Sequence, residues 1–258
     1  MNYKKNGNIA VFTLDNPPVN VTNPSTHKQF HHHLQDFLAD DAIKVGIWTA
    51  AGTRAFCAGD DIKTPRVPRT HAEIVERYLG NRSEDESLEY PGWELQVMQM
   101  QRYKPIIAAI NGPVLGQGFM YLTRLTDIRI ATPNATFGLP EIKYAMPGAG
   151  GMLKLGLEVP HAVAMWLALT GEPLDAESAQ KHGLINEIVP QEALMERAYQ
   201  IAGLIARHPS LSIRTEMEAY YQSMDMTRDQ AVAFSAHLAR LQRVAFHTRA
   251  PLGADKDD

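Results

Sequence analysis

The chain has 258 residues, of which 45% are hydrophobic and 21% are charged, as in an ordinary soluble globular protein. Its formal net charge of −4 gives no reason to expect nucleic acid or an anionic membrane as a partner. A single cysteine, Cys57, excludes an internal disulfide and favours a reducing cytoplasm. No apolar run reaches the roughly 18 residues that a membrane-spanning helix needs. We therefore expect one large domain with a small appendage.

The N-terminal segment predicts a strand, a helix and a second strand. Ile9–Leu14 has the pattern of a strand and is followed by a proline-rich turn. Asn23 or Ser25 is suited to cap the next helix, and residues 44–49 predict the second strand. The apolar residues of this helix fall on one face, namely Phe30, Leu34, Phe37 and Leu38.

Three consecutive histidines, His31, His32 and His33, lie within this predicted helix. Imidazole is a common metal ligand, but successive helical residues point about 100° apart and cannot converge on one ion. The triplet is therefore interpreted as a polar helix face, and no metal site is expected.

Residues 55–62, AFCAGDDI, predict a tight turn at Ala58-Gly59 and a helix that begins at Asp60. The start of a helix presents unpaired N–H groups and a partial positive charge, which suit an oxygen that becomes negative. The alternative is a turn with an ordinary helix cap and no role in chemistry.

A second such turn follows the predicted strand Ile106–Ile110 and the strand-breaking Asn111-Gly112-Pro113. The helix predicted over 115–125 is entered through Gly116, Gln117 and Gly118. Glycines at a helix start let other atoms approach bare backbone N–H groups.

One carboxylate, Glu141, lies in the loop after the predicted strand Ile128–Ala131. As a general base it would need partial burial and a raised pKa, whereas an isolated loop glutamate is more often exposed. The glycine-rich residues 147–151 lack the Lys-Ser/Thr of a phosphate-binding loop and predict a turn before a helix that starts at Met152.

The remainder of the chain is mostly helical. Helices are predicted over 161–169 and 176–182, with a strand over 184–189. Three more helices are predicted over Leu194–Ala206, 211–221 and 227–249. We therefore divide the chain into a core, residues 1–191, and a C-terminal helical region, residues 192–258.

Two motifs, AFCAGDDI and the PEI…PGAGG run around Glu141, occur in the order and spacing of the crotonase (enoyl-CoA hydratase/isomerase) superfamily, which this chain resembles. The segment TGEPLDAESAQKHGLINEIVP extends the resemblance. It implies an α/β fold, a spiral of repeated ββα units with a C-terminal helical region that forms trimers or dimers of trimers. The implied substrate is an acyl-CoA thioester, with coenzyme A as part of the substrate and no separate cofactor.

The same resemblance assigns roles at the site. The backbone N–H of Asp60 becomes one oxyanion donor, and Glu141 becomes the proton carrier. Counting from the flanking residues places the second donor at Gln117 or at Gly118. Gly118 is preferred because bare backbone suits close approach of a thioester oxygen.

The residues expected along the acyl-CoA are Val19, Val21, Ala58, Asp60, Asp61, Ile62, Gln117, Tyr121, Tyr144 and Phe246. Phe246 belongs to a segment that resembles the one that closes over the CoA of a neighbouring subunit. Related enzymes commonly have a small or apolar residue where Asp60 stands. Its carboxylate must point away from the oxyanion, because two negative charges repel.

The first of the two carboxylates that hydratases use falls on Met120 or Tyr121, and neither is an acid. We therefore expect enolate chemistry with proton transfer by one glutamate, as in enoyl-CoA isomerases or hydroxycinnamoyl-CoA hydratase-lyases. One alternative is a CoA-independent β-diketone hydrolase that resembles the 6-oxocamphor hydrolases. The other is a catalytically silent binding subunit.

Overall fold

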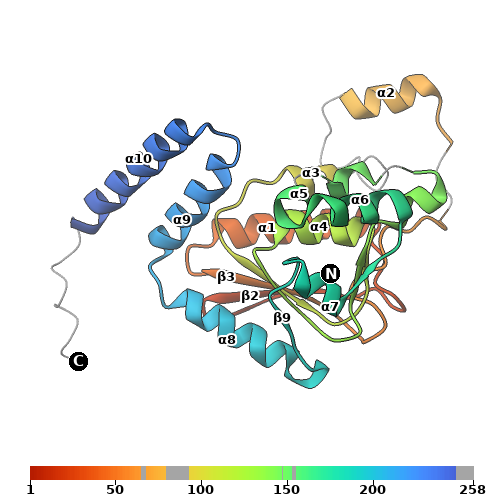
Figure 1. Cartoon of the computed structure of the whole chain (residues 1–258), viewed down its shortest axis with the longest axis horizontal. Helices are drawn as coiled ribbons and strands as arrows, with labels where there is room; N and C mark the ends of the chain where they lie inside the picture. The colour runs from red at the N-terminus through yellow and green to blue at the C-terminus, as the bar shows by residue number, and fades with distance from the viewer. Residues whose placement is uncertain (65–67, 80–92, 147, 153–154, 248–258) are drawn as a thin grey trace.

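A computed structural model describes the chain except residues 65–67, 80–92, 147, 153–154 and 248–258 (Figure 1). Its main sheet has six strands, in which β1 pairs antiparallel with β2 and every other neighbouring pair is parallel. The order across the sheet is β1 (Asn2–Asn6), β2 (Ile9–Leu14), β3 (Val45–Ala50), β4 (Ile106–Ile110), β6 (Ile128–Ala131) and β9 (Glu187–Ile188). The mixed α/β architecture predicted from the sequence is confirmed.

A second, smaller sheet has the order β5 (Val114–Leu115), β7 (Thr136–Gly138) and β8 (Leu174–Asp175). The first two strands run parallel and the third is antiparallel to its neighbour. None of these short strands was predicted, because two or three residues are too few to show a periodic pattern.

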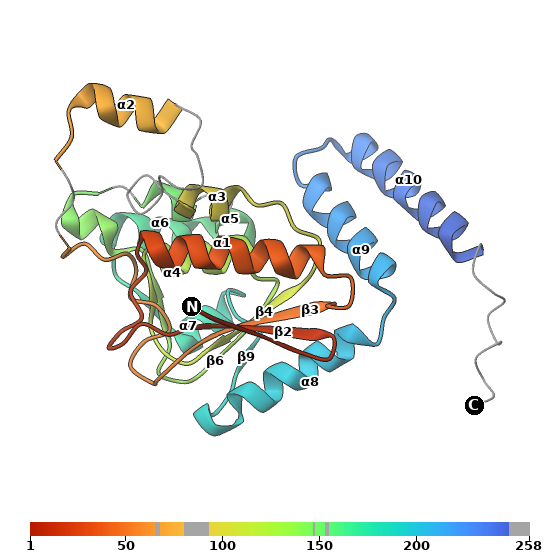
Figure 2. The ribbon, with the colours of Figure 1, turned by 180° about the vertical axis from the view of Figure 1, so that it is seen from behind.

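The main sheet is covered on both faces, which explains why β3 and β4 are buried throughout. Alternate side chains point to opposite faces of a strand. Ile107 and Ala109 of β4 pack with residues of α8 (Leu194–Ala206), whereas Ile106, Ala108 and Ile110 pack in the larger core cluster. Figures 1 and 2 show α1 (Pro24–Ala39) and α4 (Gln117–Leu125) on the face opposite α8.

Helix α1 begins as the sequence predicts. The Asn23 side chain accepts from the amide of Thr26, and Pro24 occupies the first turn. The interpretation of the three histidines as a polar face was wrong in detail. His31 packs on Trp93 with ring centroids 4.8 Å apart, and His33 stacks on Tyr3 at 5.0 Å.

The shorter elements connect the layers. The sequence placed a helix start at Met152, but that residue ends a 3₁₀ turn, and the strand predicted over 184–189 is only two residues long. The remaining α-helices are α2 (His71–Leu79), α3 (Trp93–Gln99), α5 (Leu155–Glu158), α6 (His161–Thr170) and α7 (Ala176–Lys181). The 3₁₀ helices are η2 (Pro140–Tyr144), η3 (Ala149–Met152) and η4 (Gln191–Ala193).

Two C-terminal helices, α9 (Ser210–Ser223) and α10 (Arg228–His247), pack on each other and project beyond the sheet in both views. Helix α8 instead buries Ala198 and Ala202 against the main sheet. The part of the chain that projects beyond the main sheet therefore begins at α9. No helix in the described ranges is long and apolar enough to cross a membrane.

Candidate active site

Four segments that are distant in the sequence lie side by side at the small sheet. The amide of Ala58 donates to Val19 O at 3.1 Å, and the amide of Leu115 donates to Cys57 O at 2.9 Å. The amide of Gly116 donates to the carbonyl that ends β7, at 3.0 Å. These backbone bonds bring the two predicted turns and the start of the Glu141 loop to one place.

The chain around Asp60 is extended, so the helix predicted to begin there was wrong. Thr22 N–H donates to Gly59 O at 2.9 Å, and Asp61 N–H donates to Thr22 O at 2.8 Å. The carboxylate of Asp61 accepts from the amides of Lys63 and Thr64, which closes a turn in place of a helix.

This pairing decides where the Asp60 amide points. Alternate N–H groups of an extended chain face opposite edges, and Gly59 O and Asp61 N–H both face Thr22. The Asp60 N–H therefore faces the other edge, on the side of β5. That strand stops at Leu115, so no further strand residue is present there to accept the bond. The Asp60 N–H thus lies at the end of a ladder and not at the start of a helix.

The second turn meets the first through two glycines. Gly116 has φ 55° and ψ −125°, a conformation suited to glycine, and its carbonyl accepts the first helical bond of α4, from Met120. A Cβ built on Gly59 would lie 3.7 Å from Gly116 Cα and 3.8 Å from Gln117 N. Glycine is favoured at this position because Gly59 has φ 95° and a Cβ there would also lie 3.3 Å from Leu115 O.

The structure gives Gly118 a packing role. A Cβ there would lie 2.6 Å from Cys57 Cβ and 2.7 Å from its sulfur, so the missing side chain lets α4 rest on the buried Cys57. The sequence argument explained the missing side chain of Gly118 by the close approach of a thioester oxygen. Gln117 N lies 3.8 Å from a Cβ built on Gly59, and this position beside the Asp60 turn favours it as the second donor.

Glu141 reaches this meeting point from η2. The parallel pairing of β5 with β7 places Leu115 opposite Gly138, three residues before Glu141. A Cβ on Gly116 would lie 2.9 Å from Glu141 Oε1. Atom Oε2 is buried and has no hydrogen-bond partner within the described part of the chain. Burial raises the pKa of the Glu141 carboxyl, its own N–H opposes this, and the nearby charge of Asp60 raises it further.

The Asp60 carboxylate is held on the α1 side of the donor turn, as the sequence argument requires. Its Oδ1 accepts from Thr22 Oγ1 and lies 2.9 Å from His27 Nε2, and His27 Nδ1 lies 2.8 Å from the hydroxyl of Tyr121. Sequence reasoning missed His27. The available signal was its position, because His27 shares the helical face that buries Phe30.

Other predicted binding residues are spread around this centre. Tyr121 was expected along the substrate, but it is 1% exposed and bonds to His27 inside the core, which is a correction. Ile62 and Tyr144 are about half exposed, and Phe246 lies in the projecting α10. Val19, Val21 and Ala58 are partly buried along the paired segments. Met120, at the predicted acid position, packs against the core.

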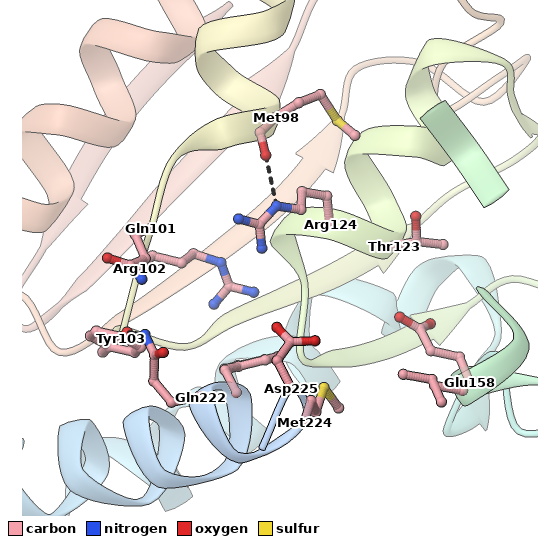
Figure 3. A pocket seen from close by; sticks show the side chains of 12 residues that line it. Met98, Gln101, Arg102, Tyr103, Thr123, Arg124, Glu158, Gln222, Met224 and Asp225 are labelled. Carbon is pink, nitrogen blue, oxygen red and sulfur yellow. Dashed lines mark hydrogen bonds between the residues drawn. The ribbon is translucent and has the colours of Figure 1, made fainter. Parts of the chain in front are cut away.

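A cavity of about 360 Å³ lies elsewhere, near the C-terminal end of α4 (Figure 3). Arg102 and Tyr221 line it, and both bond to Asp127. Arg124 also lines it and donates to Met98 O at 2.7 Å, the bond drawn in Figure 3. This cavity and the converging turns are therefore at opposite ends of one helix.

The fold and the converging turns define the class of protein as a crotonase-type α/β enzyme. Residues 4–248 match the family model described as enoyl-CoA hydratase/isomerase. The chain therefore belongs to the enoyl-CoA hydratase/isomerase family, whose substrates are acyl-CoA thioesters.

Individual relatives agree with this assignment. The chain is 33% identical to (E)-benzylidenesuccinyl-CoA hydratase of Thauera aromatica, over 88% of this chain and 84% of that protein. It is 30% identical to carnitinyl-CoA dehydratase of Escherichia coli K12, over 89% and 83%. The solved carnitinyl-CoA dehydratase of Mycobacterium avium superposes with a TM-score of 0.70 at 28% identity, over 95% of this chain and 91% of that one.

Proposed function

We propose that this enzyme adds water reversibly across the Cα=Cβ bond of a 2-enoyl-CoA to give a 3-hydroxyacyl-CoA. The observation that carries the proposal is the convergence of Glu141 with the turns at Asp60 and Gln117. A buried carboxylate oxygen of Glu141, which has no partner among the residues that the structure describes, lies beside two turns whose amides are outside regular pairing. Unsatisfied polar groups that are gathered in this way are typical of a site that a ligand completes.

The two amides would bind the thioester carbonyl oxygen. When water adds at Cβ, the electron pair of the double bond moves toward the carbonyl and its oxygen becomes negative. Fixed N–H donors stabilise this enolate, and the loss of one such donor typically costs about 2.7–4 kcal/mol in the barrier. The amides of Asp60 and Gln117 are held by the backbone, so little reorganisation is needed during the reaction.

Glu141 would move the proton. As a carboxylate it takes one proton from the attacking water, whose oxygen forms the bond to Cβ. The same carboxyl then returns that proton to Cα of the enolate, so one water is consumed and Glu141 is regenerated. A raised pKa suits a group that must both accept and return a proton.

Gln117 supports an acyl group with a polar substituent. Its side-chain Nε2 is buried and has no hydrogen-bond partner among the residues that the structure describes. Such a donor favours an acceptor brought by the ligand. The names of two relatives, benzylidenesuccinyl-CoA hydratase and carnitinyl-CoA dehydratase, indicate polar acyl groups on those proteins' substrates. A substituted acyl-CoA is therefore proposed over a simple straight chain.

A substrate panel tests the reaction. The purified enzyme would be assayed with crotonyl-CoA, a 3-enoyl-CoA, an enoyl-CoA that bears a carboxylate on the acyl group, and a cyclic β-diketone. We expect hydration, fastest with the carboxylated substrate. Isomerisation of the 3-enoyl-CoA without hydration would favour the isomerase alternative. That alternative is supported by the apolar Met120 at the position of the first carboxylate that hydratases use. Cleavage of the diketone alone would favour the CoA-independent hydrolase.

The assembly is proposed to be a trimer or a dimer of trimers formed through the projecting helices. Val232 and Val244 of α10 are each 64% exposed, and Leu241 is 55% exposed. Apolar surface of this kind on an extended helix supports a covering partner. Light scattering of the purified protein should give three or six times 28.7 kDa, and a monomer mass would contradict this assembly.

A further inference from the structure

A buried polar chain joins α1, α4 and the Asp60 turn. His27 is fully buried, and its two ring nitrogens lie 2.9 Å from Asp60 Oδ1 and 2.8 Å from Tyr121 Oη. The Tyr121 ring also meets His27 edge-on, with centroids 5.6 Å apart, and packs on Phe30 at 5.7 Å. The proposed reaction uses the backbone amide of Asp60 but none of these three side chains.

The polarity of the chain follows from its bonds. Asp60 as a carboxylate only accepts, so His27 Nε2 carries the hydrogen that is donated to it. With a neutral imidazole, Nδ1 accepts from the Tyr121 hydroxyl. The Asp60 carboxylate therefore selects the tautomer of His27, and the Tyr121 hydroxyl, which can donate to Nδ1, holds the ring in place.

The Asp60 carboxylate presents an electrostatic problem. Its residue also supplies the N–H that the thioester oxygen would contact, so a free carboxylate could swing close to the developing negative charge. Like charges at such separations repel, and strongly so where water is excluded. The turn itself does not depend on this side chain, because Thr22 N–H and Asp61 N–H hold it by backbone bonds.

We propose that His27, oriented by Tyr121, is a positioning residue that restrains the Asp60 carboxylate on the α1 side of the donor turn, away from the enolate oxygen. This inference rests on the proposed hydration at the same site. Thr22 bonds the same carboxylate oxygen, so His27 and Thr22 together fix its direction.

A double-mutant cycle tests the restraint. In His27→Leu the Asp60 carboxylate keeps its bond to Thr22 but loses the one to His27. We expect kcat to fall about 30-fold while KM changes less than about 3-fold, because the carboxylate would destabilise the enolate and not the bound substrate. In Asp60→Ala the backbone amide remains, and we expect kcat within about 5-fold of the wild type. In the double variant, kcat should recover to within about 3-fold of Asp60→Ala, since no charge remains to restrain.

Two further variants, each with a control variant, separate a positioning role from an effect on folding. His27→Gln keeps a donor within reach of Asp60 and should restore a large part of the lost kcat. Tyr121→Phe should lower kcat about 3- to 10-fold. Tyr221→Phe removes an equally bonded phenol far from the turns and should leave kcat unchanged, and His31→Asn serves as the control for a buried histidine one turn along α1.

The outcomes distinguish this inference from the proposed function. If the wild type hydrates enoyl-CoA but His27→Leu costs the same factor with and without the Asp60 carboxylate, the restraint is wrong and the hydration stands. Equal effects of Tyr121→Phe and Tyr221→Phe would also overturn it. A wild-type enzyme that hydrates no enoyl-CoA would instead refute the proposed function.

Discussion

The two ends of α4 hold polar clusters of opposite character. At the C-terminal end, Asp127 accepts from Arg102 at 2.7 and 3.0 Å, from the amide of Ile106 at 2.8 Å and from the Tyr221 hydroxyl. At the N-terminal end, Glu141 presents a buried oxygen with no protein partner in the described ranges. The Asp127 carboxylate is saturated with donors, whereas Glu141 has one oxygen, Oε2, without a donor in those ranges.

This difference separates a structural cluster, around Asp127, from the one around Glu141 that we propose to be reactive. Burial lowers the pKa of the Arg102 guanidinium, but the facing Asp127 more than offsets this and the pKa is raised. The pair ties β4 to the connection before it. No ion pair joins Glu141 to a cation among the described residues, and burial raises the pKa of its carboxyl. The cavity of about 360 Å³ accompanies the saturated cluster and lies away from the converging turns.

Replacing the unsaturated carboxylate should have the largest effect on catalysis. Glu141→Gln keeps the shape of the side chain but cannot carry the proton, and we expect kcat for hydration to fall about 10²- to 10⁴-fold. The dissociation constant for a non-reactive acyl-CoA, measured by calorimetry, should change little. Retention of more than a tenth of the wild-type kcat would remove Glu141 from the mechanism.

Breaking the saturated cluster should act on stability instead. Asp127→Asn leaves the buried guanidinium of Arg102 without its counter-ion, and such losses typically cost about 3–5 kcal/mol of unfolding free energy. Urea unfolding would measure this loss, and kcat per folded enzyme should stay at the wild-type value. A loss of kcat with unchanged stability would reverse the contrast between the two ends.

The contact between the turns can be disturbed at Gly116. Gly116→Ala adds a Cβ at a positive φ and 2.9 Å from Glu141 Oε1, so we expect a loss of about 1–3 kcal/mol of stability and a kcat reduced about 10-fold. Gly203→Ala is the matched control. It lies inside α8 with no atom within 4 Å of the new Cβ, and it should be neutral or slightly stabilising. Equal behaviour of the two variants would argue against a crowded site.

The pH dependence should report the raised pKa of Glu141. The base form is required, so kcat/KM rises with pH through the pKa of this group, at a higher pH than for an exposed glutamate. The charge of Asp60 contributes to the shift, and Asp60→Asn should move the acidic limb to lower pH by less than about one unit. A limb that moves to higher pH would contradict the assigned sign.

Stability gives the same sign by a second route. A carboxyl whose pKa is raised in the folded state binds more protons folded than unfolded, so its contribution to stability falls as pH rises from its unfolded pKa to its folded one. Glu141→Gln should therefore raise the melting temperature above that of the wild type by more at pH 7 than at pH 4.

The sequence predicted most of the long elements and both turns because their signals are local. Strand Ile106–Ile110 and helix Leu194–Ala206 have the predicted bounds, since continuous apolar runs and one-sided apolar faces survive in the fold. The extended Asp60 was missed because its conformation depends on pairing with Thr22, 38 residues away. The packing of Gly118 on Cys57 could not be predicted for the same reason, because the two residues are far apart in the sequence.

A structure of the protein with a bound, non-reactive acyl-CoA tests the central claim most directly. We predict that the thioester oxygen lies about 2.7–3.1 Å from the backbone nitrogens of both Asp60 and Gln117, with Glu141 beside Cα and Cβ of the acyl group. A thioester oxygen bound by only one of these amides, or an acyl group seated in the cavity beside Arg124, would contradict the account.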